Sequence, residues 1–306
     1  MKPNGPDRVG QVLTALGKSI CYVGPFLGIQ VLVVMPAAFA LGLEAALGGW
    51  DEDEINAAML NLDVTALTLI SGLLTLAFVL AFYLIRRKKL GEALWLRPVP
   101  APTLFTGASL APALYFVVTI VLAMLPASWM ENYGEASADI ATGTVVGVIS
   151  VALVAPVVEE FIFRGLTMTR LSQVMPGWLA VLLSAAIFGL CHGELVWFCY
   201  TFVVGAFFAF IDLRAGSILP SVLGHIMFNA IGQIMSFVMS FVPETEEGTE
   251  ILIALGVLFL AAIVLPILDR KGIAALFHSR PAPPNPPEEW TLPSAPGTYE
   301  FDPWEE

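Results

Sequence analysis

Residues 146–166 read VGVISVALVAPVVEEFIFRGL, an apolar run long enough to cross a bilayer that is nevertheless interrupted by charge. The charged residues in it are Glu159, Glu160 and Arg164. An ionised side chain costs several kcal/mol in hydrocarbon, so ionisable residues inside a membrane span mark a candidate functional site. This stretch therefore predicts both a transmembrane helix and a polar site within the membrane.

The composition of the whole chain agrees with this interpretation. Of the 306 residues, 57% are hydrophobic and only 13% are charged, and the mean hydropathy is +0.81. These values predict an all-α polytopic membrane protein with the site inside the helical bundle. We expect about eight transmembrane helices, the fifth of them short. Their ranges are 19–43, 64–85, 103–125, 140–163 with a continuation to about 173, 178–192, 195–211, 218–242 and 251–268.

The positions of the charged residues predict the orientation in the membrane. With a cytoplasmic N-terminus, all fourteen Lys and Arg residues fall in inside segments, and the outside loops carry only acids. The inside segments are 1–18, 86–102, the region around 164–177, 212–217 and the tail from 269. Because cytoplasmic loops are enriched in Lys and Arg, we expect both termini in the cytoplasm. If the protein is bacterial, the membrane is the plasma or inner membrane. The net charge of −12 arises from acidic outer loops and an acidic tail, so it does not indicate a nucleic-acid partner.

The chain divides into one large membrane domain and two flanking segments. Residues 1–18 form a cytoplasmic N-terminal segment, and residues 19–280 form the membrane domain. The first apolar run is longer than that of a signal peptide and lacks a cleavage site, so it is interpreted as a retained helix. Residues 281–306 are rich in Pro and acid and predict a disordered cytoplasmic tail. The three cysteines, an odd number in or beside apolar runs, argue against a disulfide framework or a CxxC metal site.

Helical spacing distinguishes the two adjacent acids. Glu160 and Arg164 are four residues apart on one helix face, with the acid N-terminal to the base, which favours an ion pair. Glu159 lies about 100° around the helix and has no such neighbour. We therefore expect Glu160 and Arg164 to support the site and Glu159 to act as a general base on water, a role that a desolvated carboxylate suits.

Further polar residues inside the spans repeat the four-residue spacing. His225 and Asn229 share one helix face, and Phe188 and His192 share another. If helix rise is counted from the cytoplasmic ends of the spans, Glu159 and His192 both lie about 21 Å deep, and His225 and Asn229 about 11 and 17 Å deep. The four residues can therefore meet in one site, which the depths predict to be reachable from the cytoplasmic half.

Three short motifs in this region carry a resemblance to a known family. EEFIFRG at 159–165, FGLCH at 188–192 and HIMFN at 225–229 resemble the EExxxR, FxxxH and HxxxN motifs of the CAAX prenyl protease and bacteriocin-processing family. These proteins, also called type II CAAX proteases or the Abi family, are membrane-embedded endopeptidases. The order and internal spacing match over about residues 140–240. One motif alone would be weak, but three in order make the resemblance specific.

The resemblance implies a role for each motif residue. Glu159 and His192 would activate water, His225 and Asn229 would donate hydrogen bonds to the oxyanion, and Glu160, Arg164 and Phe188 would support the site. Family members are also described as metalloproteases, and Glu159, His192 and His225 could hold a divalent metal such as zinc with water as the fourth ligand. A metal-free mechanism uses the same residues and is favoured slightly, because Asn229 is a good oxyanion donor and a poor zinc ligand.

Other functions remain open at this stage. An intramembrane polar cluster also suits a proton-coupled transporter, and the same fold without catalysis suits a membrane scaffold or immunity-type protein. The predicted partners are the membrane and a peptide or protein substrate, which could be lipid-modified or transmembrane. The aromatic sixth span is interpreted as packing or lipid-facing surface that could also border a substrate groove. Among the remaining residues, Cys191 is expected in the core, and Asp212 and Arg214 are interpreted as a short loop pair.

Overall fold

The computed structural model describes residues 8–60, 63–138, 144–239 and 249–278, and the predicted tail at 281–306 lies outside these ranges. The described residues are helical and contain no strand. In chain order the elements, with π-helical segments written η, are α1 (Arg8–Gly48), α2 (Glu52–Leu60), α3 (Val64–Ile85), α4 (Leu90–Ala93), α5 (Ala101–Ala123), α6 (Ala127–Ala138), α7 (Val145–Gly147), η1 (Val148–Val154), α8 (Ala155–Glu159), η2 (Glu160–Met168), α9 (Thr169–Leu171), α10 (Gly177–Leu190), α11 (Leu195–Ala215), α12 (Leu219–Met239), α13 (Thr249–Leu268) and α14 (Arg270–His278).

Five helical stretches are long and apolar enough to cross a membrane: α1, α3, α5, the continuous stretch Val145–Leu171, and α11. Helix α10, with 14 residues, and the apolar part of α13 are shorter. Helix α12 has 21 residues, but His225, Asn229 and Gln233 lower its hydropathy. The described part of each of the eight predicted ranges falls largely on a helix, and the number of crossings stays a prediction for the three weaker ones.

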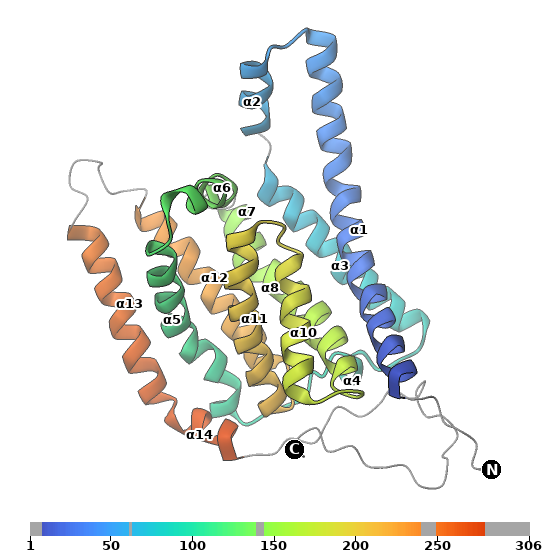
Figure 1. The fold of residues 1–306 in the computed structure, drawn as a ribbon, viewed down its shortest axis with the longest axis vertical. Helices are drawn as coiled ribbons and strands as arrows, with labels where there is room; N and C mark the ends of the chain where they lie inside the picture. The colour runs from blue at the N-terminus through green and yellow to red at the C-terminus, as the bar shows by residue number, and fades with distance from the viewer. Residues whose placement is uncertain (1–7, 61–62, 139–143, 240–248, 279–306) are drawn as a thin grey trace.

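Helix α1 is much longer than the span predicted at 19–43. It has 41 residues, about 62 Å at the usual rise, which is about twice the hydrocarbon thickness. Its last turns and α2 project beyond the rest of the bundle (Figure 1). The helix begins at Arg8, inside the segment that was expected to precede the membrane domain.

The helix that carries the two acids is interrupted by π-helical turns. The stretch Val145–Leu171 contains η1 before Pro156 and η2 from Glu160 onward. The Ala155 N–H bonds to the Ser150 carbonyl five residues earlier, as in a π-helix. The next residue, Pro156, has no N–H, so the Val151 carbonyl receives no bond from the residue five positions later. A carbonyl is thus exposed to side chains of other helices.

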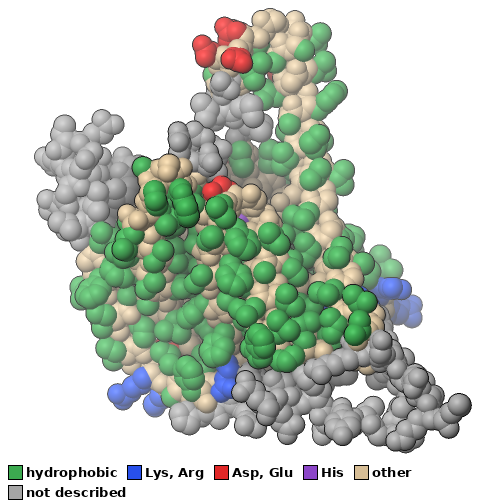
Figure 2. Space-filling view, viewed as in Figure 1, with side chains coloured by type: hydrophobic (Ala, Val, Ile, Leu, Met, Phe, Trp, Pro, Cys, Tyr) green, Lys and Arg blue, Asp and Glu red, His purple; other side chains and the backbone are tan. Residues whose placement is uncertain are grey.

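The two ends of the bundle differ in charge. Helices α2 and α6 lie at one end, and α4 and α14 lie at the other (Figure 1). On the face in Figure 2, red acidic side chains gather around α2 and blue basic side chains gather at the opposite end. We call these the acidic end and the basic end. The basic side chains at the basic end include Arg86, Arg87, Lys88, Lys89 and Arg97 in the segments between helices, and Arg270 and Lys271 at the start of α14.

Helices α5 and α12 cross at two glycines. A Cβ added to Gly224 would lie 2.6 Å from Phe208 and 2.8 Å from the Gly107 carbonyl carbon. A Cβ added to Gly107 would overlap the Pro220 carbonyl. Both positions therefore exclude a side chain, and the close approach fixes the position of α12 one residue before His225.

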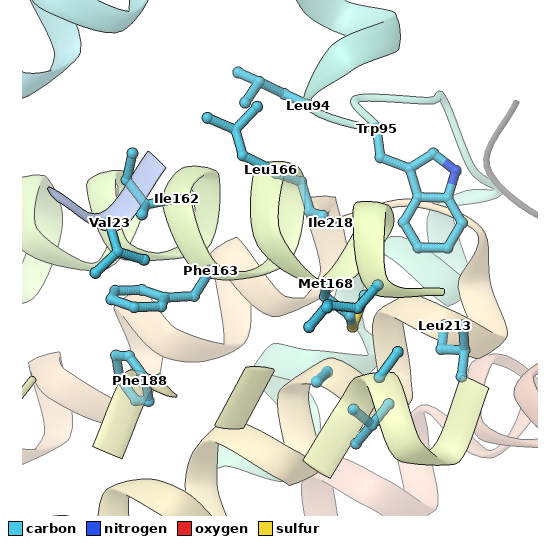
Figure 3. Close-up of a cluster of buried hydrophobic side chains, with 14 of the residues drawn as sticks. Val23, Leu94, Trp95, Ile162, Phe163, Leu166, Met168, Phe188, Leu213 and Ile218 are labelled. Carbon is cyan, nitrogen blue, oxygen red and sulfur yellow. The ribbon is translucent and has the colours of Figure 1, made fainter. Parts of the chain in front are cut away.

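A layer of buried apolar side chains fills the half of the bundle toward the basic end. Figure 3 shows Leu94 and Trp95, from the segment containing α4, beside Leu166 of η2 and Ile218 before α12. These four side chains are at most 3% exposed. The backbone joins the same layer, because the Ile218 N–H donates to the Trp95 carbonyl at 3.2 Å.

The interpretation of Asp212 and Arg214 as a loop pair is wrong. Helix α11 continues to Ala215, and Gly216, with φ of 71°, ends it. Asp212 is fully buried, and its Oδ1 accepts the Ser221 N–H of α12 at 3.2 Å. Arg214 Nε instead donates to the Leu276 carbonyl of α14 at 2.6 Å. Each residue thus joins α11 to a different helix.

Candidate active site

A cavity of about 630 Å³ lies within the helical bundle. Its lining includes the four residues predicted to be catalytic, namely Glu159, His192, His225 and Asn229. They come from α8, the turn after α10, and α12. The structure therefore brings these four side chains to one space, whereas their roles in a reaction stay predictions.

The predicted ion pair between Glu160 and Arg164 is present and fully buried. Arg164 Nε lies 3.2 Å from Glu160 Oε2, in a contact that is an ion pair rather than a well-aligned hydrogen bond. Arg164 also donates from a terminal nitrogen to the Gly205 carbonyl of α11 at 3.2 Å. Its guanidinium lies over the Phe188 ring, 4.5 Å from the ring centre. Arg164 therefore contacts groups on η2, α10 and α11.

Glu160 has a second partner that spacing in the sequence does not predict. Its Oε1 lies 2.8 Å from Nδ1 of His225, which is 65 residues further along the chain. An ionised carboxylate can only accept, so the Nδ1 of His225 carries the proton and donates it. Glu160 thus links Arg164 to His225 and fixes the orientation of the imidazole.

The other nitrogen of His225 faces Glu159. Nε2 of His225 lies 3.6 Å from Oε2 of Glu159, whose side chain is 19% exposed in the cavity. With Nδ1 already donating to Glu160, an Nε2–H requires the imidazolium form. The two carboxylates and Arg164 around it then give a cluster of two negative and two positive charges, which reduces the cost of burial. In this form His225 presents one N–H to the cavity.

His192 is also held through its Nδ1 nitrogen. Its Nδ1 lies 2.9 Å from the carbonyl of Phe188, one helical turn earlier. A carbonyl cannot donate, so Nδ1 carries a proton and donates in this bond. The ring packs edge-on against Phe188, with 4.8 Å between ring centres. In both imidazoles Nδ1 is therefore held by a protein acceptor, and Nε2 is the nitrogen left for a partner in the cavity.

Asn229 is anchored to the interrupted helix. Its Nδ2 donates to the Val151 carbonyl at 2.8 Å, the carbonyl that Pro156 leaves without a backbone donor. The amide nitrogen has two hydrogens, so one remains for the cavity that Asn229 lines. The anchor fixes the side chain in one rotamer.

Phe188 packs as predicted. The ring is 1% exposed and lies between His192 and His225, with 6.0 Å between the Phe188 and His225 ring centres. Phe208 stacks on the other side of His225 at 5.6 Å. These two rings exclude water from the faces of the imidazole and hold its plane.

The described residues do not fit a metal site. They contain no group of three His, Cys, Asp or Glu side chains close enough together to hold an ion. Glu159 and His225 approach each other, and the bond from Nδ1 of His192 to the Phe188 carbonyl leaves Nε2 as the nitrogen that a metal would use. Among the described residues, however, Glu159, His192 and His225 do not come close enough together to form a three-ligand set.

Several cavity residues were not found from the sequence. Tyr115, Tyr133 and Tyr200 line the cavity, and the ring of Tyr133 lies 6.0 Å from that of Tyr200. In α6, burial raises the pKa of Tyr133 above its usual range, so its phenol stays neutral. Cys191, expected in the core, is half-buried and lines the cavity, because α10 ends one residue earlier. The short length predicted for α10 is the only feature of the sequence that could have indicated that Cys191 faces the cavity.

Comparison with known proteins agrees with the motifs. Residues 141–231 match the model of a family described as type II CAAX prenyl endopeptidase Rce1-like. The chain is 28% identical over 126 residues to the membrane peptidase YdiL of Bacillus subtilis (strain 168), covering 41% of this chain and 52% of that protein. It is 24% identical over 140 residues to CAAX prenyl protease 2 of Caenorhabditis elegans, covering 40% of this chain and 52% of that protein. No solved structure matches.

These similarities concern one part of the chain. It spans about half the length of the two curated relatives, and the matched segment holds all three motifs. Together with its apolar helices, the match identifies an integral membrane protein. The resemblance read from the motifs is therefore confirmed, and residues 141–231 are similar to the Rce1-like type II CAAX prenyl endopeptidases.

Proposed function

We propose that this chain is an intramembrane endopeptidase that hydrolyses a peptide bond with activated water. The observation that carries the proposal is the convergence of two imidazoles on one cavity. Nδ1 of each ring is held by a protein acceptor, and Glu159 and Asn229 line the same space. We assign a basic Nε2 to His192 and an Nε2–H to His225. This pairing of bases with donors is what acyl transfer to water requires.

Glu159 and His192 form the basic side of the proposed mechanism. A water molecule between them donates one proton to the carboxylate or to Nε2 while its oxygen attacks the scissile carbonyl carbon. The carbonyl π electrons move to oxygen and give a tetrahedral oxyanion. When the carbon–nitrogen bond breaks, the protonated base returns the proton to the leaving amine, so the products are one carboxylic acid and one amine.

His225 and Asn229 form the donor side. The Nε2–H of His225 and the second amide hydrogen of Asn229 can both reach an oxyanion in the cavity. Each donor is held before the reaction, His225 by Glu160 and Asn229 by the Val151 carbonyl. Donors fixed before the reaction contribute about 3 to 4 kcal/mol each to such a transition state.

The proposed orientation has eight crossings with both termini in the cytoplasm. The segments at the basic end hold Lys and Arg, and the segments at the acidic end hold Asp and Glu. This asymmetry supports the orientation through the enrichment of basic residues in cytoplasmic loops. For a bacterial protein, the membrane is the plasma membrane.

The proposed substrate is a peptide or protein segment that enters the membrane plane. The name of one relative includes a prenyl group, and the apolar wall of the cavity, with Phe26, Val118 and Phe228, could accept a lipid or an apolar side chain. A soluble peptide and a lipid-modified peptide are both accommodated by this chemistry, so the test uses both.

The experiment uses the full chain, purified and reconstituted in vesicles. Two quenched fluorescent peptides of identical sequence, one with a farnesylated cysteine and one without, are incubated with wild type, Glu159→Gln and His192→Ala. We expect cleavage by wild type and a loss on the order of 10³-fold in each variant. In H₂¹⁸O, one labelled oxygen should enter the new carboxyl group. Glu92→Gln at the basic end, where Glu92 pairs with Lys89 in an exposed contact, is the matched control and should cleave normally.

Two results would contradict the proposal. Cleavage that persists in Glu159→Gln removes the proposed base. The second result combines two findings. Wild type cleaves neither these peptides nor the membrane proteins trapped on Glu159→Ala in cells, and it carries a proton-driven flux that depends on Glu159. Together these findings would assign the cluster to a transporter.

A further inference from the structure

The cavity occupies only the half of the bundle near the acidic end. Its lining includes Thr65 at the start of α3, Leu122 at the end of α5 and Trp197 at the start of α11. It also includes Tyr133 of α6, the helix at the acidic end (Figure 1). All of these helix ends point away from α4 and α14.

The order of residues along three helices agrees with this placement. Glu159, the last residue of α8, lines the cavity, and on η2 it is followed toward the basic end by the buried pair Glu160 and Arg164 and then by Leu166. Phe163 is the residue of η2 that also lines the cavity. On α11 and α12 none of the residues from Phe208 to Ser221 lines the cavity. Most of them are buried, whereas Phe210 is exposed on the outer surface of the protein. The polar site thus lies above a closed layer.

That layer seals the path to the basic end. Leu94, Trp95, Leu166 and Ile218 are at most 3% exposed, and none of them lines the cavity. A Cβ added to Gly165 would lie 3.1 Å from Leu94, so no space remains between this segment and η2. The Ser217 hydroxyl donates to the Arg97 carbonyl at 2.8 Å and fastens the same segment to the start of α12.

Two acidic side chains outside the cavity lining bond to lining residues on the side toward the acidic end. Asp63 accepts from the hydroxyl of the lining residue Thr65 at 2.7 Å, and Glu194 accepts from the N–H of the lining residue Trp197 at 2.8 Å. Hydrogen bonds from Thr65 and from the Ala66 N–H hold the pKa of Asp63 below its usual range, so it stays ionised. No Lys or Arg occurs among the described lining residues. A cavity flanked by negative charges attracts positively charged peptide segments.

We propose that the cavity is entered from the non-cytoplasmic side of the membrane, and that it takes peptide segments exposed there with Lys or Arg near the cleaved bond. The inference rests on the proposed function for the cleavage and on the proposed orientation for the side. It differs from the depth estimate made from the sequence, which predicted access from the cytoplasmic half. That estimate gave depths but not the position of the sealing layer.

A native side chain can report the side of entry. Cys191 lines the cavity and is half-buried, whereas Cys21 and Cys199 are exposed elsewhere. In a Cys21→Ser/Cys199→Ser chain, a membrane-impermeant methanethiosulfonate reagent is added to right-side-out or to inside-out vesicles, and intact mass measures modification. In a cysteine-free chain, the exposed residues Asp53→Cys of α2 and Lys271→Cys of α14 report the two ends.

We expect Cys191 and Asp53→Cys to react in right-side-out vesicles, and Lys271→Cys to react only in inside-out vesicles. Reaction of Cys191 together with Lys271→Cys would overturn the entry route, and reaction of Asp53→Cys from the cytoplasmic side would overturn the orientation. If Cys191 reacted from neither side in the folded chain but fully after unfolding in SDS, the cavity would not be open to water, which also contradicts the proposal.

The charge preference is tested on the same thiol. We compare the rates at which a cationic trimethylammonium reagent and an anionic sulfonate reagent modify Cys191, each normalised to its rate with a free thiol in solution. The cationic reagent should react about 10-fold faster, and the difference should be smaller at high salt. An equal or inverted ratio would contradict the preference for basic segments. Labelling requires no cleavage, so a failure of the proposed peptidase activity leaves this result intact, and the reverse also holds.

Discussion

Glu160 and His225, 65 residues apart in the chain, form a buried contact of 2.8 Å between Oε1 and Nδ1. The same carboxylate pairs with Arg164 at 3.2 Å. The orientation of His225 therefore depends on Glu160 and also on Arg164, which holds Glu160 in place. The second acid of the motif is therefore a positioning residue for the imidazole. This arrangement leads to the first prediction.

Glu160→Gln should reduce peptide cleavage on the order of 10³-fold while keeping the chain folded enough to purify. The neutral amide no longer stabilises an imidazolium, and in a neutral ring whose Nδ1–H donates to the amide oxygen, Nε2 carries no hydrogen toward the cavity. Cleavage kinetics of reconstituted protein measure the effect, with Glu92→Gln as control. A fall in KM alone, with kcat unchanged, would contradict the positioning role.

Arg164→Lys should fail to replace the arginine. A lysine can pair with Glu160, but it lacks the planar fork that also reaches the Gly205 carbonyl and lies over Phe188. We expect a loss of about 3 kcal/mol or more in the free energy of unfolding, because a buried charge is left poorly compensated. Unfolding in SDS titration measures the loss, and a change below about 1 kcal/mol would contradict the buried network.

The sequence predicted those features of the site that depend on local spacing. Glu160 and Arg164 are four residues apart on one helix, so their pair follows from helix geometry. The contact from Glu160 to His225 does not, because it requires the packing of α12 against a helix with π-helical turns. The four residues named from the motif resemblance do line one cavity, but the motifs could not assign which nitrogen of each imidazole faces it.

The errors have similar causes. Asp212 was interpreted as a loop residue because the apolar run ends at 211, whereas the helix itself continues until Gly216 allows a positive φ. In its buried position the Asp212 carboxylate accepts an N–H from the first turn of α12, which a helix start leaves unpaired. Hydropathy locates the end of a membrane span, and only backbone hydrogen bonding locates the end of the helix.

The crossing of α5 and α12 gives a prediction about stability. Gly224→Ala should destabilise the chain by about 1 to 3 kcal/mol, because the new methyl group would overlap Phe208 and the Gly107 backbone. Since His225 is the next residue, cleavage should fall as well. Gly28→Ala in α1, where nothing lies within 4 Å of the added Cβ, is the matched control and should be neutral. Equal thermal stability of both variants in detergent would contradict the close crossing.

Chelation should leave the activity unchanged. The described residues gather no three metal-ligating side chains, and the proposed mechanism uses only protein groups and water. We expect cleavage after treatment with EDTA or 1,10-phenanthroline to match the untreated enzyme, and elemental analysis to find less than about one zinc per ten chains. Loss of activity on chelation, with recovery on adding zinc, would instead support a metal held by Glu159, His192 and His225.

Asn229 combines two roles that a second substitution can separate. Asn229→Ala removes both an oxyanion donor and the only side-chain donor found for the Val151 carbonyl among the described residues, so kcat should fall about 10²- to 10³-fold and stability by about 1 to 3 kcal/mol. Pro156→Ala restores an N–H five residues after Val151, where the π-helical pattern can use it. In the double variant we expect stability to recover and cleavage to remain low.

The cycle is completed by measuring cleavage and stability for wild type, Asn229→Ala, Pro156→Ala and the double variant. Wild type and Pro156→Ala should cleave at similar rates, because the proline lies outside the proposed chemistry. Recovery of cleavage together with stability in the double variant would reduce Asn229 to a helix anchor, since an oxyanion donor cannot be replaced by an N–H that bonds to Val151. Recovery of neither would mean that the Val151 carbonyl does not accept the new N–H, and that the π-helical interruption is not caused by Pro156.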